Sequence, residues 1–95
     1  MPLNKLQQLM VITMEECGEL AQRCSKTIRK FDTIEQALER TTVGSINRIK
    51  LLEEVGDVQC MIDLMIEHGL MTQDEIDARI DEKREKLKTW SDLIE

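Results

Sequence analysis

Two acidic segments of this sequence repeat one pattern. Each contains two acidic residues three positions apart, Glu16 with Glu19 and Glu54 with Asp57, and one more Glu precedes each pair. On an α-helix this spacing places both carboxylates of a pair on one face, one turn apart. Four carboxylates directed into one core repel one another and lose hydration unless a cation lies between them. The pattern therefore indicates a metal site shared by two helices.

The donor types indicate which metal such a site would hold. Oxygen-only ligand sets suit hard cations, and Mg²⁺ in particular is held by a few carboxylates while waters and substrate phosphates complete its octahedron. A di-iron bundle would instead supply Glu-x-x-His pairs, and the only histidine, His68, lies outside both acidic pairs. The sequence thus favours Mg²⁺ over iron.

Apolar residues at three- and four-residue steps predict the two long helices that carry the acidic pairs, from about Asn4 to about Lys30 and from about Ile46 to Glu67. The second of these is apolar nearly all round, which is typical of a central helix, and Glu54 points into apolar surroundings on it. Gly18 and Gly56 within the pairs suggest close backbone approach of the two helices. The expected core stripe of the first helix is Leu6, Met10, Cys17, Leu20, Ala21, Cys24 and Ile28.

Capping patterns predict two further helices. Asp32 with Glu35 opens a short helix to about Arg40, followed by a loop over 41–45, and Thr72 with Glu75 opens a last helix. His68 and Gly69 are expected to form a left-handed cap that ends the preceding helix. The last helix reaches about Trp90, and its expected buried line is Ile76, Ile80, Leu87 and Trp90, with Lys83 on the same line.

Length and composition predict one all-α domain over residues 1–95, an antiparallel helical bundle. The chain has 95 residues, one Pro, four Gly and 2% aromatic residues, so it offers few helix breakers and little strand-forming material. Four short elements hardly cover the apolar central helix. We therefore expect oligomerisation, as a homodimer or homotetramer, to complete the bundle.

Charge and cysteine content exclude several classes of partner. A net charge of −6 argues against binding of a nucleic-acid polymer, which depends on clustered Lys and Arg. Every apolar run is interrupted by charge well short of a membrane span, and no signal peptide is expected. The three cysteines, an odd number without ligand spacing, are expected to be buried thiols in the reducing cytoplasm.

The paired segments resemble those of a known family. Glu16–Glu19, which reads ECGE, and Glu54–Asp57, which reads EVGD, look like the ExxE and ExxD motifs of the MazG-like all-α nucleoside triphosphate pyrophosphohydrolases, in this order. Each is preceded by an extra Glu and followed by an apolar run, and a basic last helix ending in Lys83–Trp90 completes the signature. The resemblance covers most of the chain.

The resemblance implies an activity and a cofactor. It implies Mg²⁺-dependent hydrolysis of a nucleoside triphosphate between its α and β phosphates, which yields a nucleoside monophosphate and pyrophosphate, with Mn²⁺ as a substitute for Mg²⁺. It also implies that Glu16, Glu19, Glu54 and Asp57 are the metal ligands. Neither the nucleobase nor the sugar follows from it.

The resemblance also implies roles for residues other than the metal ligands. Glu15 or Glu53 is expected to orient a ligand or to take a proton from the attacking water. The residues expected to hold the outer phosphates are Lys83, Lys86, Lys26, Arg23 and Lys30. An equally weighted interpretation of Lys83 is that its stem covers the core while its ammonium group stays in water.

A second function class fits the same residues. A helical interaction or regulatory module would use the acidic face to bind a basic partner and would perform no reaction. A metal that raises the melting temperature distinguishes the two, because only a site that binds the cation gains stability from it.

Overall fold

The computed structural model describes residues 3–29 and 44–95 of the chain. These residues form three α-helices and no strand, which confirms the all-α class for this part of the chain. The helices are α1 (Lys5–Ile28), α3 (Ile46–Glu67) and α4 (Gln73–Trp90). The predicted short helix after Asp32 lies outside the described residues. No described helix has the length and apolar character that crossing a membrane requires.

Reciprocal capping boxes begin two of these helices. Before α1, the Asn4 side chain accepts from the Gln7 backbone N–H at 2.7 Å, and the Gln7 side chain accepts from the Asn4 N–H at 3.0 Å. Before α4, the Thr72 hydroxyl accepts from the Glu75 N–H at 3.2 Å, and Glu75 accepts from the Thr72 N–H at 2.9 Å. Each box satisfies N–H groups that a helix start leaves without partners. The box at Thr72 confirms the predicted start of α4.

A Schellman cap ends α3. Gly69 has a positive φ of 76°, its N–H donates to the Ile66 carbonyl at 2.9 Å, and the Leu70 N–H donates to the Met65 carbonyl at 3.0 Å. These two bonds satisfy carbonyls that the helix end would otherwise leave free. The left-handed cap predicted at Gly69 is confirmed.

We expect Gly69→Ala to destabilise the protein by about 1 kcal/mol, because a Cβ is strained at positive φ. Gly69→Asn should cost less, since Asn tolerates the left-handed conformation. Urea unfolding followed by circular dichroism measures both. Equal stability of Gly69→Ala and the parent protein would contradict this role of the glycine.

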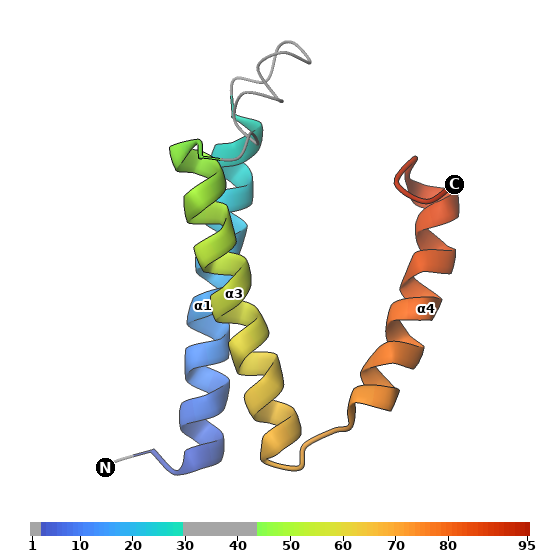
Figure 1. Cartoon of the computed structure of the whole chain (residues 1–95). Coiled ribbons are helices and arrows are strands. Elements are labelled where there is room, and N and C mark those ends of the chain that lie inside the picture. The colour runs from blue at the N-terminus through green and yellow to red at the C-terminus, as the bar shows by residue number, and fades with distance from the viewer. Residues whose placement is uncertain (1–2, 30–43) are drawn as a thin grey trace. The chain divides into compact units, whose positions relative to one another are not determined.

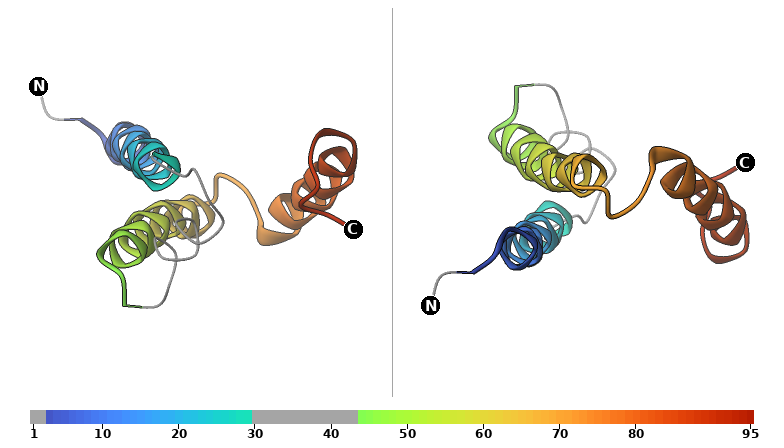
Figure 2. Two further views of the ribbon diagram at one scale, coloured as in Figure 1. Left: turned by 90° about the horizontal axis from the view of Figure 1, so that it is seen from above. Right: turned by 90° about the horizontal axis from the view of Figure 1, so that it is seen from below.

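The chain divides into two compact units, Met1–Leu64 and Met65–Glu95, and the boundary lies within α3. In the first unit, α1 and α3 lie side by side and run in opposite directions, as a helical hairpin (Figures 1 and 2). The second unit contains the last turn of α3 and the whole of α4.

The hairpin is held by one stripe of residues from each helix, which we call the seam. Its members alternate at four- and three-residue spacing, the heptad pattern of coiled coils. At one end of the seam, the Asn47 amide donates to the buried Thr27 hydroxyl at 3.0 Å. The seam residues are buried or half-buried: Leu9, Thr13, Glu16, Leu20, Arg23 and Thr27 on α1, and Asn47, Leu51, Glu54, Val58 and Met61 on α3.

The prediction of the core stripe of α1 is therefore wrong: the stripe that contacts α3 is displaced by one position from the predicted one. Six of the seven predicted members are exposed, and Leu20 alone belongs to the seam. The reason is that α1 carries two stripes at heptad spacing, and the more polar of the two contacts α3. Among the described residues, Leu9 and Met61 are the only buried apolar side chains.

Other burial predictions also need correction. Cys17, Cys24 and Cys60 are exposed, not buried thiols. A Cβ added at Gly18 or Gly56 would meet nothing within 4 Å, so close helix approach does not explain these glycines.

The buried line predicted along α4 is only partly buried. Ile76 and Leu87 are half-buried, whereas Ile80 is 48% and Trp90 83% exposed. The physical reason is that the second unit contains one complete helix and therefore no second complete helix to cover this line.

Candidate metal centre

The four acidic residues of the two motifs meet in the middle of the hairpin. Glu16 and Glu54 are seam residues, and Glu19 and Asp57 lie beside the seam. One carboxylate oxygen from each of the four lies within 4.8 Å of the others. We call this group the carboxylate quartet. The sequence prediction that these side chains converge is confirmed.

The quartet is buried on one side and open on the other. Glu16 and Glu54 are half-buried, whereas Glu19 and Asp57 are exposed. The Oε2 atoms of Glu16 and Glu54 are buried and accept no hydrogen bond within the described chain. Buried polar atoms are normally satisfied, so two unpaired carboxylate oxygens in one cluster require an explanation.

The cluster makes ionisation of its inner carboxyls unfavourable. Burial raises the pKa of Glu16 above its ordinary value of 4.5, and the neighbouring carboxylates, Glu19 first, raise it further. Burial likewise raises the pKa of Glu54, with Glu19 and Asp57 adding to the effect, while the positive charge of Arg23 opposes it. Without a cation, both inner carboxyls therefore take up a proton more readily than an ordinary Glu side chain does.

A divalent cation fits these properties. The donors are four carboxylates without nitrogen or sulfur, the set that Mg²⁺ and other hard cations prefer. A cation among them would pair the buried oxygens and offset the repulsion between like charges. The open side formed by Glu19 and Asp57 would leave coordination positions for water or phosphate. The residues present thus suit Mg²⁺.

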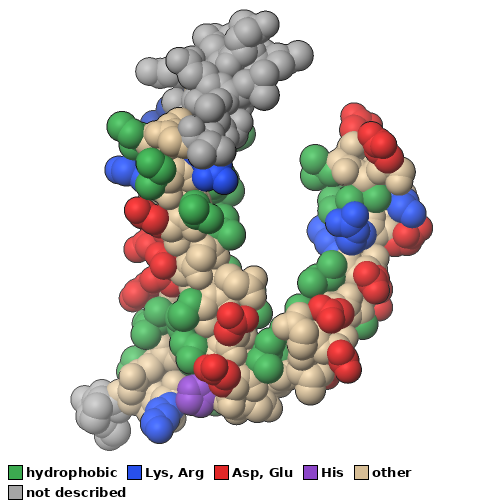
Figure 3. All heavy atoms as spheres, viewed as in Figure 1, with side chains coloured by type: hydrophobic (Ala, Val, Ile, Leu, Met, Phe, Trp, Pro, Cys, Tyr) green, Lys and Arg blue, Asp and Glu red, His purple; other side chains and the backbone are tan. Residues whose placement is uncertain are grey.

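Arg23 adds a positive charge to the edge of the quartet. It is a half-buried seam residue, its Nε is buried without an acceptor among the described residues, and its charge lowers the pKa of Glu54. On the hairpin, acidic side chains gather at mid-length, and Lys and Arg side chains lie beyond them (Figure 3). This end of the hairpin is therefore suited to an anion that also contacts a metal in the quartet.

The other predicted site residues on or after α1 and on α3 do not belong to the quartet. Glu15 and Glu53 are exposed and do not belong to the quartet. Lys26 is exposed in the last turn of α1, and Lys30 lies outside the described residues. The assignment of a proton-accepting role to Glu15 or Glu53 stays a prediction.

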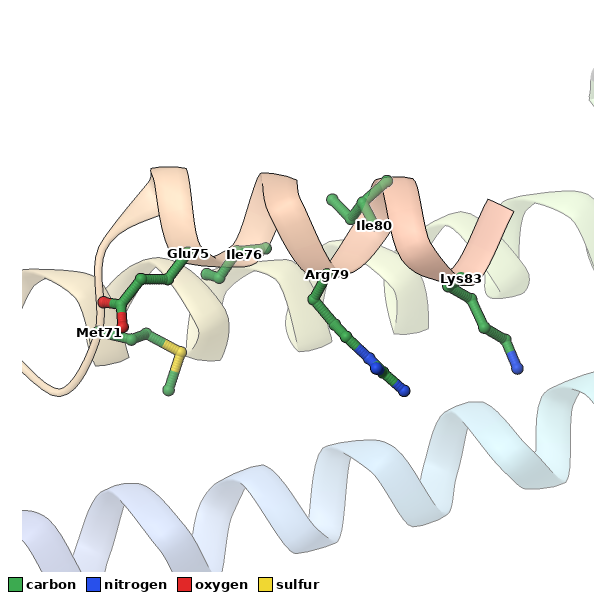
Figure 4. A pocket seen from close by; sticks show the side chains of 6 residues that line it. All are labelled: Met71, Glu75, Ile76, Arg79, Ile80 and Lys83. Atoms are coloured by element: carbon green, nitrogen blue, oxygen red, sulfur yellow. The ribbon is translucent and has the colours of Figure 1, made fainter. Parts of the chain in front are cut away.

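Lys83 and Lys86 are exposed on α4, in the second unit. Lys83 borders a hollow of about 460 Å³, and its side chain extends to the same side as that of Arg79 (Figure 4). Apolar side chains line the hollow between charged ones, so both interpretations of Lys83, a phosphate contact and a stem that covers apolar surface, stay open. The residues around the hollow are Met71, Glu75, Ile76, Arg79, Ile80 and Lys83.

One further cation, Lys50, lies one helical turn from the quartet and was not among the predicted site residues. Lys50 is exposed on α3, four residues before Glu54, and Arg23 is four residues after Glu19. Because the helices are antiparallel, both cations lie toward the same end of the hairpin. The position of Lys50 four residues before Glu54, one helical turn away, was the sequence signal that could have identified it.

Comparisons with protein-family models, curated proteins and solved structures find no match to this chain. The MazG-like resemblance stays a prediction. The convergence of the four carboxylates is an observation of the structure and does not depend on that resemblance.

Proposed function

We propose that this protein is a Mg²⁺-dependent nucleoside triphosphate pyrophosphohydrolase. It hydrolyses an NTP or dNTP between the α and β phosphates and releases the monophosphate and pyrophosphate. A second copy of the chain completes the fold.

One observation carries this proposal: two helices bring four carboxylates together, with two buried oxygens unpaired and Arg23 at the edge. An ordinary acidic surface would place these groups apart in solvent, where they repel least. The same arrangement suits a metal that also contacts a triphosphate. The motif resemblance supports the hydrolytic step.

The chain's own residues have distinct roles in this reaction. Glu16, Glu19, Glu54 and Asp57 would hold the cation and fix its open side. When bound, Mg²⁺ neutralises phosphate charge and lowers the pKa of a bound water. Glu15 or Glu53 is the candidate to take the proton of the attacking water. Overall, water adds to the α-phosphorus, and the bond to the bridging oxygen breaks to release pyrophosphate.

The outer phosphates of the nucleotide are negatively charged, and cationic side chains must bind them. Arg23 lies at the edge of the quartet, where its charge acts on Glu54, and Lys26 follows it on α1. Lys30, Lys83 and Lys86 are proposed for the same task on the resemblance alone.

Product analysis tests the proposal directly. Purified protein is incubated with each of the common NTPs and dNTPs plus Mg²⁺, and products are separated by ion-exchange chromatography. Monophosphate with pyrophosphate is expected for at least one substrate. Diphosphate with phosphate would contradict the α–β cleavage, and no turnover of any nucleotide with Mg²⁺ or Mn²⁺ would contradict enzymatic function.

The acidic cluster also fits a second candidate, a non-catalytic interaction module whose acidic face binds a basic partner. Such a module has no need of a cation. Its melting temperature would be unchanged by Mg²⁺, whereas a metal-binding enzyme would melt at a higher temperature.

We expect Arg23→Met to raise KM for the nucleotide by about 10-fold or more, because a charge-assisted contact to phosphate is lost. Steady-state kinetics measure the change. Arg29→Met is the matched control, since Arg29 is exposed after the end of α1. An unchanged KM in Arg23→Met would contradict the phosphate contact.

A further inference from the structure

The side of the hairpin on which the quartet opens carries three pairs of residues in a fixed order. Glu19 of α1 and Asp57 of α3 form the middle pair, because one carboxylate oxygen of each lies within 4.8 Å of the other. Residues seven positions apart, two helical turns, lie on the same side of a helix. Stepping seven positions both ways from Glu19 and from Asp57 gives four more residues on this side: Ile12, Lys26, Lys50 and Leu64.

The antiparallel course of α1 and α3 determines how these residues pair. A step forward along α1 from Glu19 and a step backward along α3 from Asp57 lead toward the same end of the hairpin (Figure 1). Lys26 therefore lies at the level of Lys50, and Ile12 lies at the level of Leu64. We call the three pairs the cationic, acidic and apolar levels. They follow one another at about 10 Å, the rise of seven helical residues.

The three levels are accessible to a ligand. Lys26 and Lys50 are exposed, Ile12 is 40% exposed, and Leu64 is half-buried. Figure 3 shows the same order of side-chain types along one edge of the hairpin, with Lys and Arg beyond one end of the acidic group and hydrophobic side chains beyond the other. The side on which the quartet opens thus has a cationic and an apolar end.

The position of Lys50 is unfavourable for the hairpin alone. Lys26 lies in the last turn of α1, where the helix dipole favours a cation, whereas Lys50 lies near the start of α3, where the dipole disfavours one. Lys50 also shares its level with a like charge. It forms no ion pair with any residue in the described parts of the chain. A bound anion at the cationic level would offset these costs.

We propose that the three levels set the direction in which the nucleotide binds, with Lys50 as a phosphate-binding residue. The outer phosphates lie at the cationic level, the bond to be cleaved lies at the quartet, and the nucleoside lies over Ile12 and Leu64. This inference rests on the proposed function and adds to it the residues that recognise each end of the substrate.

The reverse direction is less favourable. It would place the charged outer phosphates against the apolar level, where they would lose hydration without gaining a cation. Beyond that level, the next cation on α1 is Lys5, 14 positions and about 21 Å before Glu19. The uncharged base and sugar have apolar surface that can pack on Ile12 and Leu64. Charge and apolar character therefore favour the same direction.

Isothermal titration calorimetry with inorganic pyrophosphate and Mg²⁺ tests the phosphate end. Lys50→Met should weaken binding about 10-fold, because a charge-assisted contact to phosphate is lost. Lys50→Arg should retain most of the affinity. Lys5→Met is the matched control, since Lys5 is exposed at the start of α1, beyond the apolar level. Unchanged affinity in Lys50→Met, or an equal loss in Lys5→Met, would overturn the assignment of Lys50.

The nucleoside end is tested with the common ribo- and deoxyribonucleoside monophosphates as probes. Ile12→Ser should weaken binding of the monophosphate that the parent protein binds best by about 3-fold or more, because apolar contact area is lost. It should leave pyrophosphate binding unchanged, and Lys50→Met should show the reverse pattern. Met14→Ser is the control, because Met14 is 68% exposed and two positions, about 200° of rotation, from Ile12. Variants that weaken both probes equally would overturn the direction.

Hydrolysis assays on the same variants separate this inference from the proposed function. A parent protein that cleaves a triphosphate, while Lys50→Met and Ile12→Ser bind both probes as their controls do, would overturn the direction alone. A parent protein that gives the expected pattern of binding but cleaves no triphosphate would contradict the proposed hydrolysis alone. Binding of neither probe by the parent protein would overturn both.

Discussion

Replacing Glu54 by Gln is expected to abolish nucleotide hydrolysis, with a fall in kcat/KM of at least about 100-fold. The Oε2 atom of Glu54 is buried and accepts no hydrogen bond within the described chain, and one carboxylate oxygen of Glu54 lies within 4.8 Å of one from each of the other three residues. Gln retains the size of the side chain but removes the charge that a Mg²⁺ ligand needs. Initial rates of pyrophosphate release at several Mg²⁺ concentrations measure the effect.

The matched control is Glu67→Gln, an exposed Glu in the last turn of α3. It should retain the rate of the parent protein. Far-ultraviolet circular dichroism should show unchanged helix content in both variants. Full activity in Glu54→Gln would contradict its assignment as a metal ligand.

The double variant Glu16→Gln with Glu54→Gln is expected to have a higher Tm than the parent protein when no metal is present at pH 7. Burial raises the pKa of both carboxyls above 4.5, so ionising them at neutral pH costs stability that Gln does not lose. With Mg²⁺ added, the parent protein should gain stability and the double variant should not.

Because the pKa values of Glu16 and Glu54 are raised, the difference in Tm between the double variant and the parent protein should depend on pH. A raised pKa means that the folded state binds more protons than the unfolded state between 4.5 and the raised value, so stability falls as pH rises through that window. The gain in Tm of the double variant should be near zero at pH 4 and grow toward pH 7. Melting curves in a chelator measure it.

Glu15→Gln with Glu53→Gln is the control for that series, because both side chains are exposed outside the quartet. A gain of equal size in this control, or a gain that shrinks toward pH 7, would be incompatible with the burial of Glu16 and Glu54 as its cause.

Much of the described fold could be predicted because local signals agree with it. The bounds of α3, and the start of α4 at its Thr72 capping box, follow from periodicity and from caps that act over a few residues. The face of α1 that packs could not be predicted by hydrophobicity. Its seam contains Glu16, Arg23 and Thr27, and the more apolar stripe beside it is exposed.

The site was predictable in its membership but not in its detail. Three-residue spacing on two facing helices suffices to bring the quartet together. The unpaired oxygens and the buried Nε of Arg23 depend on the register between α1 and α3, which the Thr27–Asn47 contact fixes at one end. That contact joins residues far apart in the sequence, and no local pattern indicates it.

Binding of Mn²⁺, followed through the electron paramagnetic resonance signal of the free ion, tests the central claim most directly. The parent protein should remove Mn²⁺ from solution saturably, and Mg²⁺ should displace it. The double variant Glu16→Gln with Glu54→Gln should leave the free-ion signal unchanged. Equal binding by the two proteins, or no binding by the parent protein with or without nucleotide, would contradict a metal centre in the quartet.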